Sequence, residues 1–213
     1  MFDRQLTFLI MGHEGTGKTT LAKLFTAKPP IGIPSPTQQI DSFSGKAKLK
    51  SSRHKSFLSF ERWRKYKLFI FDTPGKFSER RQWREAFKKA PEPISLVFVA
   101  NPSQPPADTA SALEEIYNQY LESLSSNPEK ADKIAESKPF LLYIVLNQFS
   151  GEKKVDLEKY YDSILRSIVT VIRDKIPFLS VERSGFNFLE KPEPFYDLNS
   201  ILERMKRYFY EET

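Results

Sequence analysis

The chain has 213 residues, of which 39% are hydrophobic and 14% aromatic, so it can bury a core and is not predicted to be disordered. Its formal net charge is +6 and it contains no cysteine, which excludes a disulfide scaffold, a thiolate metal site and a cysteine nucleophile. No apolar run approaches the ~20 residues of a membrane span, and neither a signal peptide nor a lipidation motif is recognised, so we expect a cytoplasmic protein, either free or peripheral to a membrane.

The first predicted elements are a strand at residues 6–11 and a helix at 19–25. The segment between them, GHEGTGKT, fits the phosphate-binding pattern G-x-x-x-x-G-K-[ST] at every position. Its glycines let backbone N–H groups cradle phosphate oxygens, Lys18 reaches the β- and γ-phosphates, and the Thr19 hydroxyl ligates Mg²⁺. The side chains of His13 and Glu14 occupy variable positions and are expected to face solvent. The predicted nucleotide-binding residues of this phosphate loop are Gly12, Gly15, Thr16, Gly17, Lys18, Thr19 and Thr20.

A loop rich in Pro, Ser and Thr is predicted at residues 31–41, and a basic segment follows it. Residues 46–67 hold nine cations and one acid, so the rest of the chain carries a net charge of −2. Such a segment attracts an acidic partner or an anionic membrane surface, and nucleic acid is the weaker alternative. The segment could equally be a solvated hairpin that binds no partner. The aromatic residues within it are spaced by three, which suits either a packed helix or stacking on nucleic acid: Phe57, Phe60, Trp63 and Tyr66.

A second phosphate motif follows the strand predicted at residues 67–72. The string D-T-P-G begins at Asp72, a carboxylate at a strand end that can hold Mg²⁺ through water. Gly75 is small enough for its N–H to approach a γ-phosphate. Downstream of a complete phosphate loop, this motif strengthens the prediction of a site for a nucleoside triphosphate and Mg²⁺.

The remaining elements alternate in the same way. Strands are predicted at 94–100, 140–146 and around 178–181, and helices at 107–124, 157–172 and 199–210, with Asp197 or Asn199 as the cap of the last helix. The apolar runs at 94–100 and 140–146 are continuous, as expected of strands covered on both faces. We predict an α/β fold of the P-loop NTPase type, a three-layer αβα sandwich with a mainly parallel sheet of about six strands, in one domain spanning residues 1–213.

Together, the two phosphate motifs resemble those of the small GTPases, particularly the ADP-ribosylation-factor-like group and the signal-recognition-particle receptor β subunit. In that family a Pro-Thr pair opens the first switch, and Pro36-Thr37 lies in the matching loop. The resemblance implies that Thr37 completes a magnesium site with Thr19 and Asp72. It also implies GTP or GDP as ligand, a second switch that includes Trp83-Arg84, and effector contacts through residues 31–45 and 73–88.

Three positions depart from the family pattern. Lys76 stands where a glutamine normally orients the attacking water, and an ammonium accepts no hydrogen bond, so we predict slow hydrolysis. Alternatively, Lys76 neutralises developing charge on the γ-phosphate, which makes Lys18 and Lys76 the candidate catalytic residues.

The other two departures concern the base. In the string Asn147-Gln148-Phe149-Ser150, Ser150 replaces the aspartate that reads guanine, which weakens discrimination, and Glu152 is near enough in sequence to substitute. A degraded base-supporting loop, Ser184-Gly185-Phe186, is expected after the last strand, with Phe186 stacking on the base.

These observations predict a regulatory switch that binds GTP or GDP and hydrolyses GTP slowly to GDP and phosphate. One alternative is a nucleotide-binding interaction module without turnover. The other is a P-loop kinase, in which the arginines of residues 80–84 would form a lid over the phosphates.

Overall fold

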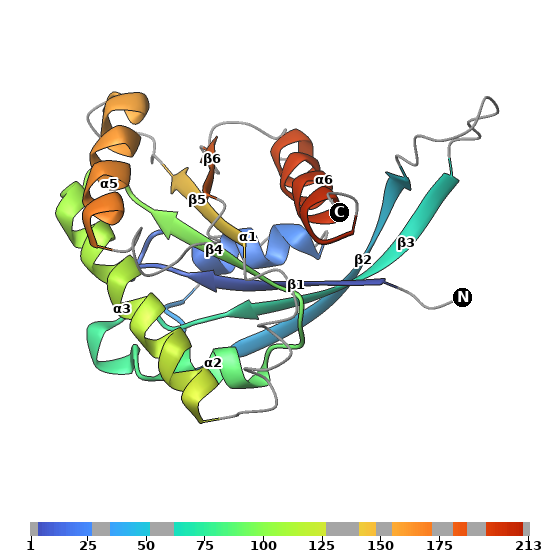
Figure 1. Cartoon of the computed structure of the whole chain (residues 1–213), viewed down its shortest axis with the longest axis horizontal. Coiled ribbons are helices and arrows are strands. Elements are labelled where there is room, and N and C mark those ends of the chain that lie inside the picture. Colours follow the sequence, from blue (N-terminus) through green and yellow to red (C-terminus); the bar gives the residue numbers. More distant parts are fainter. Residues whose placement is uncertain are drawn as a thin grey trace.

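The computed structural model describes residues 4–26, 35–51, 62–126, 141–147, 155–171, 181–186 and 195–210. Their strands form one six-stranded sheet in the order β2-β3-β1-β4-β5-β6, in which only β2 runs antiparallel to its neighbour (Figure 1). The strands are β1 (Arg4–Met11), β2 (Asp41–Ser51), β3 (Arg62–Asp72), β4 (Ile94–Ala100), β5 (Leu141–Asn147) and β6 (Val181–Phe186). The helices are α1 (Lys18–Phe25), the short η1 (Phe77–Glu79), α2 (Gln82–Lys89), α3 (Pro106–Ser125), α5 (Leu157–Val171) and α6 (Phe195–Tyr210).

Two hydrophobic clusters, one on each face of the sheet, hold the layers together. On one face, α1 and α6 pack against alternate residues of β1, β3, β4 and β5. On the other, α2, α3 and α5 cover the intervening residues of β1, β4 and β5. All residues of β4 and β5 are buried, which explains their uninterrupted apolar runs. The predicted three-layer α/β sandwich with about six mainly parallel strands is confirmed.

The basic segment is strand where the structure describes it, and the helical alternative is wrong there. Residues 46–51 belong to β2 and residues 62–67 to β3, whereas 52–61, with Phe57 and Phe60, lie outside the described residues. Trp63 and Tyr66 point to opposite faces of β3, because side chains alternate along a strand: Trp63 is 59% exposed and Tyr66 is buried.

Three further expectations need correction. Residues 184–186 are paired with Val145–Asn147 in β6 and therefore do not form a loop after the last strand. Asp197 and Asn199 lie inside α6, which begins at Phe195, so neither is its cap. The loop predicted at residues 31–41 ends before residue 41, because residues 41–45 belong to β2; the other segment predicted to contact effectors, 73–88, is largely helical, as η1 and α2.

None of the described helices combines the length and the apolar character that a bilayer crossing requires.

Candidate functional site

The phosphate loop, residues 12–19, connects the end of β1 to α1. Gly12, Gly15 and Gly17 have φ angles of 140°, 74° and 94°, a region that L side chains rarely adopt. A Cβ atom on Gly12 would lie 2.2 Å from the carbonyl oxygen of Val99, so the loop passes directly against β4. Helix α1 has no side-chain cap and no acid in its first turn, which leaves its N-terminal N–H groups available to an anion. Thr20 lies in that first turn and is half-buried.

Lys18 is buried inside the loop. Its Nζ donates a hydrogen bond to the carbonyl oxygen of His13 at 2.7 Å. Burial lowers the pKa of Lys18 to about 8, against the opposing effect of the nearby Asp72 and Glu14 carboxylates. A phosphate group beside Lys18 would favour the charged ammonium, so this lysine is matched to an anionic ligand.

Thr19, Thr37 and Asp72 meet, although they come from three separate segments. The Thr19 hydroxyl donates to Asp72 Oδ2 at 2.6 Å, the Thr37 hydroxyl donates to the same oxygen at 3.0 Å, and the two hydroxyl oxygens are 2.9 Å apart. Two cis ligands of an octahedral Mg²⁺ ion, each at about 2.0–2.1 Å, would be separated by about 2.9 Å. The separation of the Thr19 and Thr37 hydroxyl oxygens therefore equals that of two adjacent Mg²⁺ ligands.

Asp72 is the buried centre of this arrangement. Burial raises the pKa of its carboxyl group, and the hydrogen bond from Thr19 and the charge of Lys18 oppose that rise. Its second oxygen, Oδ1, is buried without a hydrogen-bond partner among the described residues. An orphaned buried carboxylate oxygen calls for a cation or an ordered water, and a magnesium ion with its water shell would satisfy it. An open cleft of about 1080 Å³ adjoins the site, lined by Thr19, Lys23, Asp41, Gln82 and the loop residues 35–39.

The D-T-P-G segment is fixed against the phosphate loop. Thr73 anchors it to β1, because both its backbone N–H and its hydroxyl donate to the carbonyl oxygen of Ile10. The indole N–H of the buried Trp83 donates to the carbonyl oxygen of Pro74 at 2.9 Å. A Cβ on Gly75 would lie 2.5 Å from both Lys18 Nζ and the backbone nitrogen of Glu14. Gly75 thus sits directly beside the phosphate loop, at a distance that only glycine permits.

His13 and Arg80 form a contact that the sequence did not predict. The Arg80 guanidinium lies 2.7 Å from His13 Nδ1 and 3.0 Å from Glu115 Oε2, and it also covers the rings of Phe77 and Trp83. Because a guanidinium only donates, Nδ1 must be the accepting nitrogen of a neutral imidazole. Burial and the Arg80 charge lower the pKa of His13, which keeps it neutral. The expectation that His13 faces solvent is wrong, whereas Glu14 is exposed as expected.

The two predicted switch segments also touch. The side-chain amide of Gln82, at the start of α2, donates to the carbonyl oxygen of Gln38 at 3.0 Å and to Glu79 Oε2 at 2.8 Å. Lys76 stands nearby, 47% exposed, with its Nζ 3.9 Å from the Glu14 carboxylate. Lys76 therefore lies beside the phosphate loop, where it forms this solvent-exposed ion pair.

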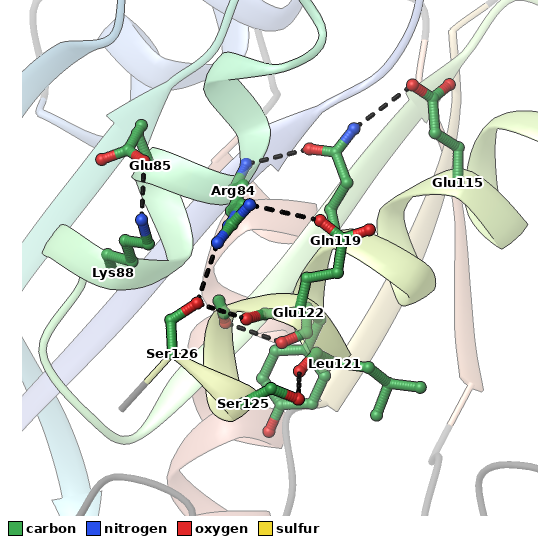
Figure 2. A network of polar contacts seen from close by, with 11 residues as sticks. Arg84, Glu85, Lys88, Glu115, Gln119, Leu121, Glu122, Ser125 and Ser126 are labelled. Carbon is green, nitrogen blue, oxygen red and sulfur yellow. Dashed lines mark hydrogen bonds and ion pairs between the residues drawn. The ribbon is translucent and has the colours of Figure 1, made fainter. Parts of the chain in front are cut away.

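Figure 2 shows that the side chain of Arg84 extends towards α3. Its guanidinium lies 3.5 Å from the Glu122 carboxylate and 2.8 Å from the Ser126 hydroxyl, and its backbone N–H donates to the Gln119 side chain. Arg80 is engaged with His13 and Glu115 as described above. These arginines fix η1 and α2 to their neighbours, and their contacts do not favour a lid over the phosphates.

Of the residues predicted to bind the base, only Asn147 has a described contact. Its side chain is buried and its Nδ2 donates to the carbonyl oxygen of Thr16 at 2.9 Å, while its Oδ1 has no partner among the described residues. Gln148, Ser150 and Glu152 lie outside the described residues. Ser184 and Gly185 lie in β6, and Phe186 is the register partner of Asn147, so the end of β6 adjoins this position.

Neither a protein-family model nor a curated protein matches the sequence of this chain. Solved structures do resemble its fold. The Arl6/BBS3 small GTPase from Trypanosoma brucei with bound GppNp aligns with a TM-score of 0.61 and 13% identity, covering 96% of this chain and 99% of that one. The signal recognition particle receptor SRβ–GTP/SRX complex from Chaetomium thermophilum aligns with a TM-score of 0.58 and 16% identity, covering 95% of this chain and 99% of that one. The chain therefore has the small-GTPase fold over nearly its whole length.

Proposed function

We propose that the protein is a molecular switch that binds GTP or GDP together with Mg²⁺. The observation that carries this proposal is the convergence of Thr19, Thr37 and Asp72 within 2.6–3.0 Å of one another. Each comes from a different segment: the phosphate loop, the loop before β2 and the end of β3. Solved small GTPases of the same fold, one bound to GppNp and one to GTP, support the choice of ligand.

Each residue of the site has a separate task in this proposal. The phosphate-loop N–H groups and Lys18 bind the β- and γ-phosphates, and the Thr19 and Thr37 hydroxyls face the metal position while Asp72 orients its water shell. When bound, Mg²⁺ would neutralise charge on the phosphate oxygens. In this proposal Thr37 and Gly75 respond to a γ-phosphate, because the Thr37 hydroxyl faces the metal position and Gly75 lies directly beside the phosphate loop. Gln82, which bonds Gln38, would pass that change from one segment to the other.

We propose that hydrolysis is slow because Lys76 occupies the position of the water-orienting glutamine. An ammonium donates hydrogen bonds but accepts none, so it cannot align a nucleophilic water as an amide does. Its 3.9 Å approach to Glu14 brings a positive charge next to the phosphate loop, which is compatible with charge neutralisation at the γ-phosphate as well. Substituting Lys76 by alanine and by glutamine separates the two roles: slower single-turnover hydrolysis in Lys76→Ala supports neutralisation, and faster hydrolysis in Lys76→Gln supports a missing water-orienting group.

The base is the part of the ligand for which the site has the fewest described contact residues. Asn147 is the residue placed to contact it, since its Oδ1 is buried without a described partner and its Nδ2 holds Thr16. We propose guanine as the preferred base with weaker discrimination than an aspartate at position 150 would provide. The surface that would report the nucleotide state to effector proteins consists of residues 31–45 and 73–88.

The nucleotide that copurifies with the protein and the rate of phosphate release over hours test this proposal. We expect guanine nucleotide in the purified protein, competition by GTP and GDP more strongly than by ATP, and slow release of phosphate from GTP. Lys18→Ala serves as the control that removes nucleotide binding. Binding without any release above the Lys18→Ala background would favour the interaction module without turnover, and transfer of the γ-phosphate to an acceptor other than water would favour a kinase. Failure to bind any nucleotide would refute the proposal.

A further inference from the structure

The distal halves of β2 and β3 form a two-stranded ribbon that projects beyond the rest of the sheet (Figure 1). One face of this ribbon is apolar and packed. Leu49, Tyr66 and Leu68 are buried in the same cluster as the α6 residues Ile201 and Met205. Lys206 of α6, itself 1% exposed, donates a hydrogen bond to the carbonyl oxygen of Lys50. Helix α6 therefore supports the ribbon from behind and fixes the orientation of its other face.

The other face carries a ladder of lysines. Lys46 is directly opposite Lys67 and Lys48 is directly opposite Lys65, and all four are exposed. Further along the ribbon, Lys50 is opposite Trp63, with its Nζ 5.6 Å from the ring centroid. We call this the lysine face, and we define it by Lys46, Lys48, Lys50, Trp63, Lys65 and Lys67. No acidic residue shares the face among the described residues of β2 and β3.

This arrangement is unfavourable for the isolated protein. Like charges directly opposite each other destabilise a strand pair. No ion pair of the described residues involves Lys46, Lys48, Lys65 or Lys67. Lysines on an edge strand do protect it from pairing with other chains, and that role accounts for those on β2. It does not account for Lys65 and Lys67, because β3 is already covered by β2 and β1.

We propose that the lysine face docks the protein onto an anionic lipid bilayer. The charges are all lysines in two rows on paired strands, which suits many dispersed negative headgroups. They lack the forked geometry with which arginine reads individual phosphates or bases. Arg64 points to the opposite side of β3, away from this face. Trp63, 59% exposed at the end of the ladder, is the side chain that favours the membrane–water interface.

Nucleic acid is the competing ligand, and the observations favour it less. Single-stranded nucleic acid binds to grooves with several exposed aromatic rings for successive bases. Within the described part of the ribbon, Trp63 is the only exposed aromatic ring of the lysine face, and Phe69 further down β3 is half-buried with Lys67 over its ring. The proposal is independent of the nucleotide site, because the lysine face contains none of the residues assigned to that site.

Sedimentation of the full chain with vesicles tests this proposal. We expect binding to phosphatidylcholine vesicles that contain about one third phosphatidylserine, weaker binding in high salt, and none to pure phosphatidylcholine. Since each lysine near an anionic surface contributes about a factor of five, Lys48→Gln/Lys65→Gln should bind about 30-fold more weakly. The matched control, Lys89→Gln/Lys159→Gln, removes the same charge from exposed lysines of α2 and α5 and should bind like the wild type.

Two further variants distinguish a loss of charge from a loss of folding and test whether Trp63 contacts the membrane. Lys48→Arg/Lys65→Arg keeps the charges and should retain wild-type binding, and the glutamine pair should melt no lower than the wild type because it removes like-charge repulsion. The chain has two tryptophans, and since Trp83 is buried, a blue shift of emission on vesicle binding should come from Trp63 and disappear in Trp63→Phe. Unchanged vesicle binding by the glutamine pair, equal loss in the control, no change in emission, or binding to an oligonucleotide but not to vesicles would each overturn the proposal.

Discussion

Gly75→Ala is the substitution that most directly tests whether the D-T-P-G segment senses the γ-phosphate. The added Cβ would lie 2.5 Å from Lys18 Nζ, 2.5 Å from the Glu14 nitrogen and 2.6 Å from the His13 carbonyl carbon. Two of these atoms are phosphate-loop backbone and cannot move aside, and ordinary contacts of this kind are about 3.5 Å, so the segment must retreat by about 1 Å. Thr73 is bonded twice to Ile10, so the displacement falls on Pro74 and Gly75 and leaves Asp72 in place.

The retreat removes any hydrogen bond from the Gly75 N–H to a γ-phosphate and leaves the rest of the site unchanged. A hydrogen bond to a charged group contributes about 1.5–3 kcal/mol, so the preference for triphosphate over diphosphate should fall by about 10–100-fold. We would measure the dissociation constants of GDP and of a non-hydrolysable GTP analogue by calorimetry. Gly45→Ala in β2 is the matched control, because its nearest neighbour, the Phe25 carbonyl oxygen, would be 3.3 Å away. A wild-type affinity ratio in Gly75→Ala would refute the assignment of this segment as a γ-phosphate sensor.

Three further predictions concern single groups of the site. Because the pKa of buried Lys18 is lowered to about 8, nucleotide affinity should weaken as the pH rises above 8, by up to about tenfold per pH unit, and an affinity independent of pH would contradict this. Burial and Arg80 lower the pKa of His13 below 6.5, so the folded protein binds this proton less readily than the unfolded chain. The wild type therefore has the stability that depends on neutral His13 above pH 6.5 and loses it as the pH falls. His13→Gln lacks that stability at every pH, so the melting temperatures of the two proteins should converge in acid; a parallel fall would contradict this. Asn147→Ala removes the donor to the Thr16 carbonyl oxygen and should lower the free energy of unfolding by about 1–2 kcal/mol. This corresponds to a Tm lower by about 2–8 °C, and an unchanged Tm would show that the hydrogen bond does not stabilise the fold.

The parts of the fold and site that could be predicted are those that depend on residues close together in the sequence. The phosphate loop has a fixed spacing between its glycines and Lys18, and Asp72 ends an apolar strand. Strand β4 begins and ends where predicted, because burial on both faces leaves an uninterrupted apolar run from Ile94 to Ala100. Helix α3 shows the same local signal in its buried residues Ala112, Ile116 and Tyr120.

The predictions that failed depended on spacing that two structures share or on contacts between distant segments. The aromatic spacing of three suggested a helix around Trp63 and Tyr66, whereas the alternation of lysines with Ala47 and Leu49 marks a strand with one buried face. The contact between His13 and Arg80 joins residues 67 positions apart, and no local sequence pattern predicts it. Strand β6 extends to Phe186, beyond the apolar run that predicted it, because Ser184 and Gly185 are in register with Val145 and Leu146 of β5.

The two ends of the candidate site differ in how much of the binding free energy they can supply. At the phosphate end, Lys18, the turn of N–H groups and the threonines beside Asp72 would meet charged phosphate oxygens or the metal ion, and charge-assisted hydrogen bonds are roughly twice as strong as neutral ones. At the base end, Ser150 offers a neutral hydroxyl in place of a carboxylate. If Ser150 faces the base, as the sequence predicts, the change at position 150 would lower selectivity between bases much more than affinity for a nucleotide. Under the proposed function, loss of base specificity would not prevent switching, because Thr37 and Gly75 would respond to the γ-phosphate and not to the base.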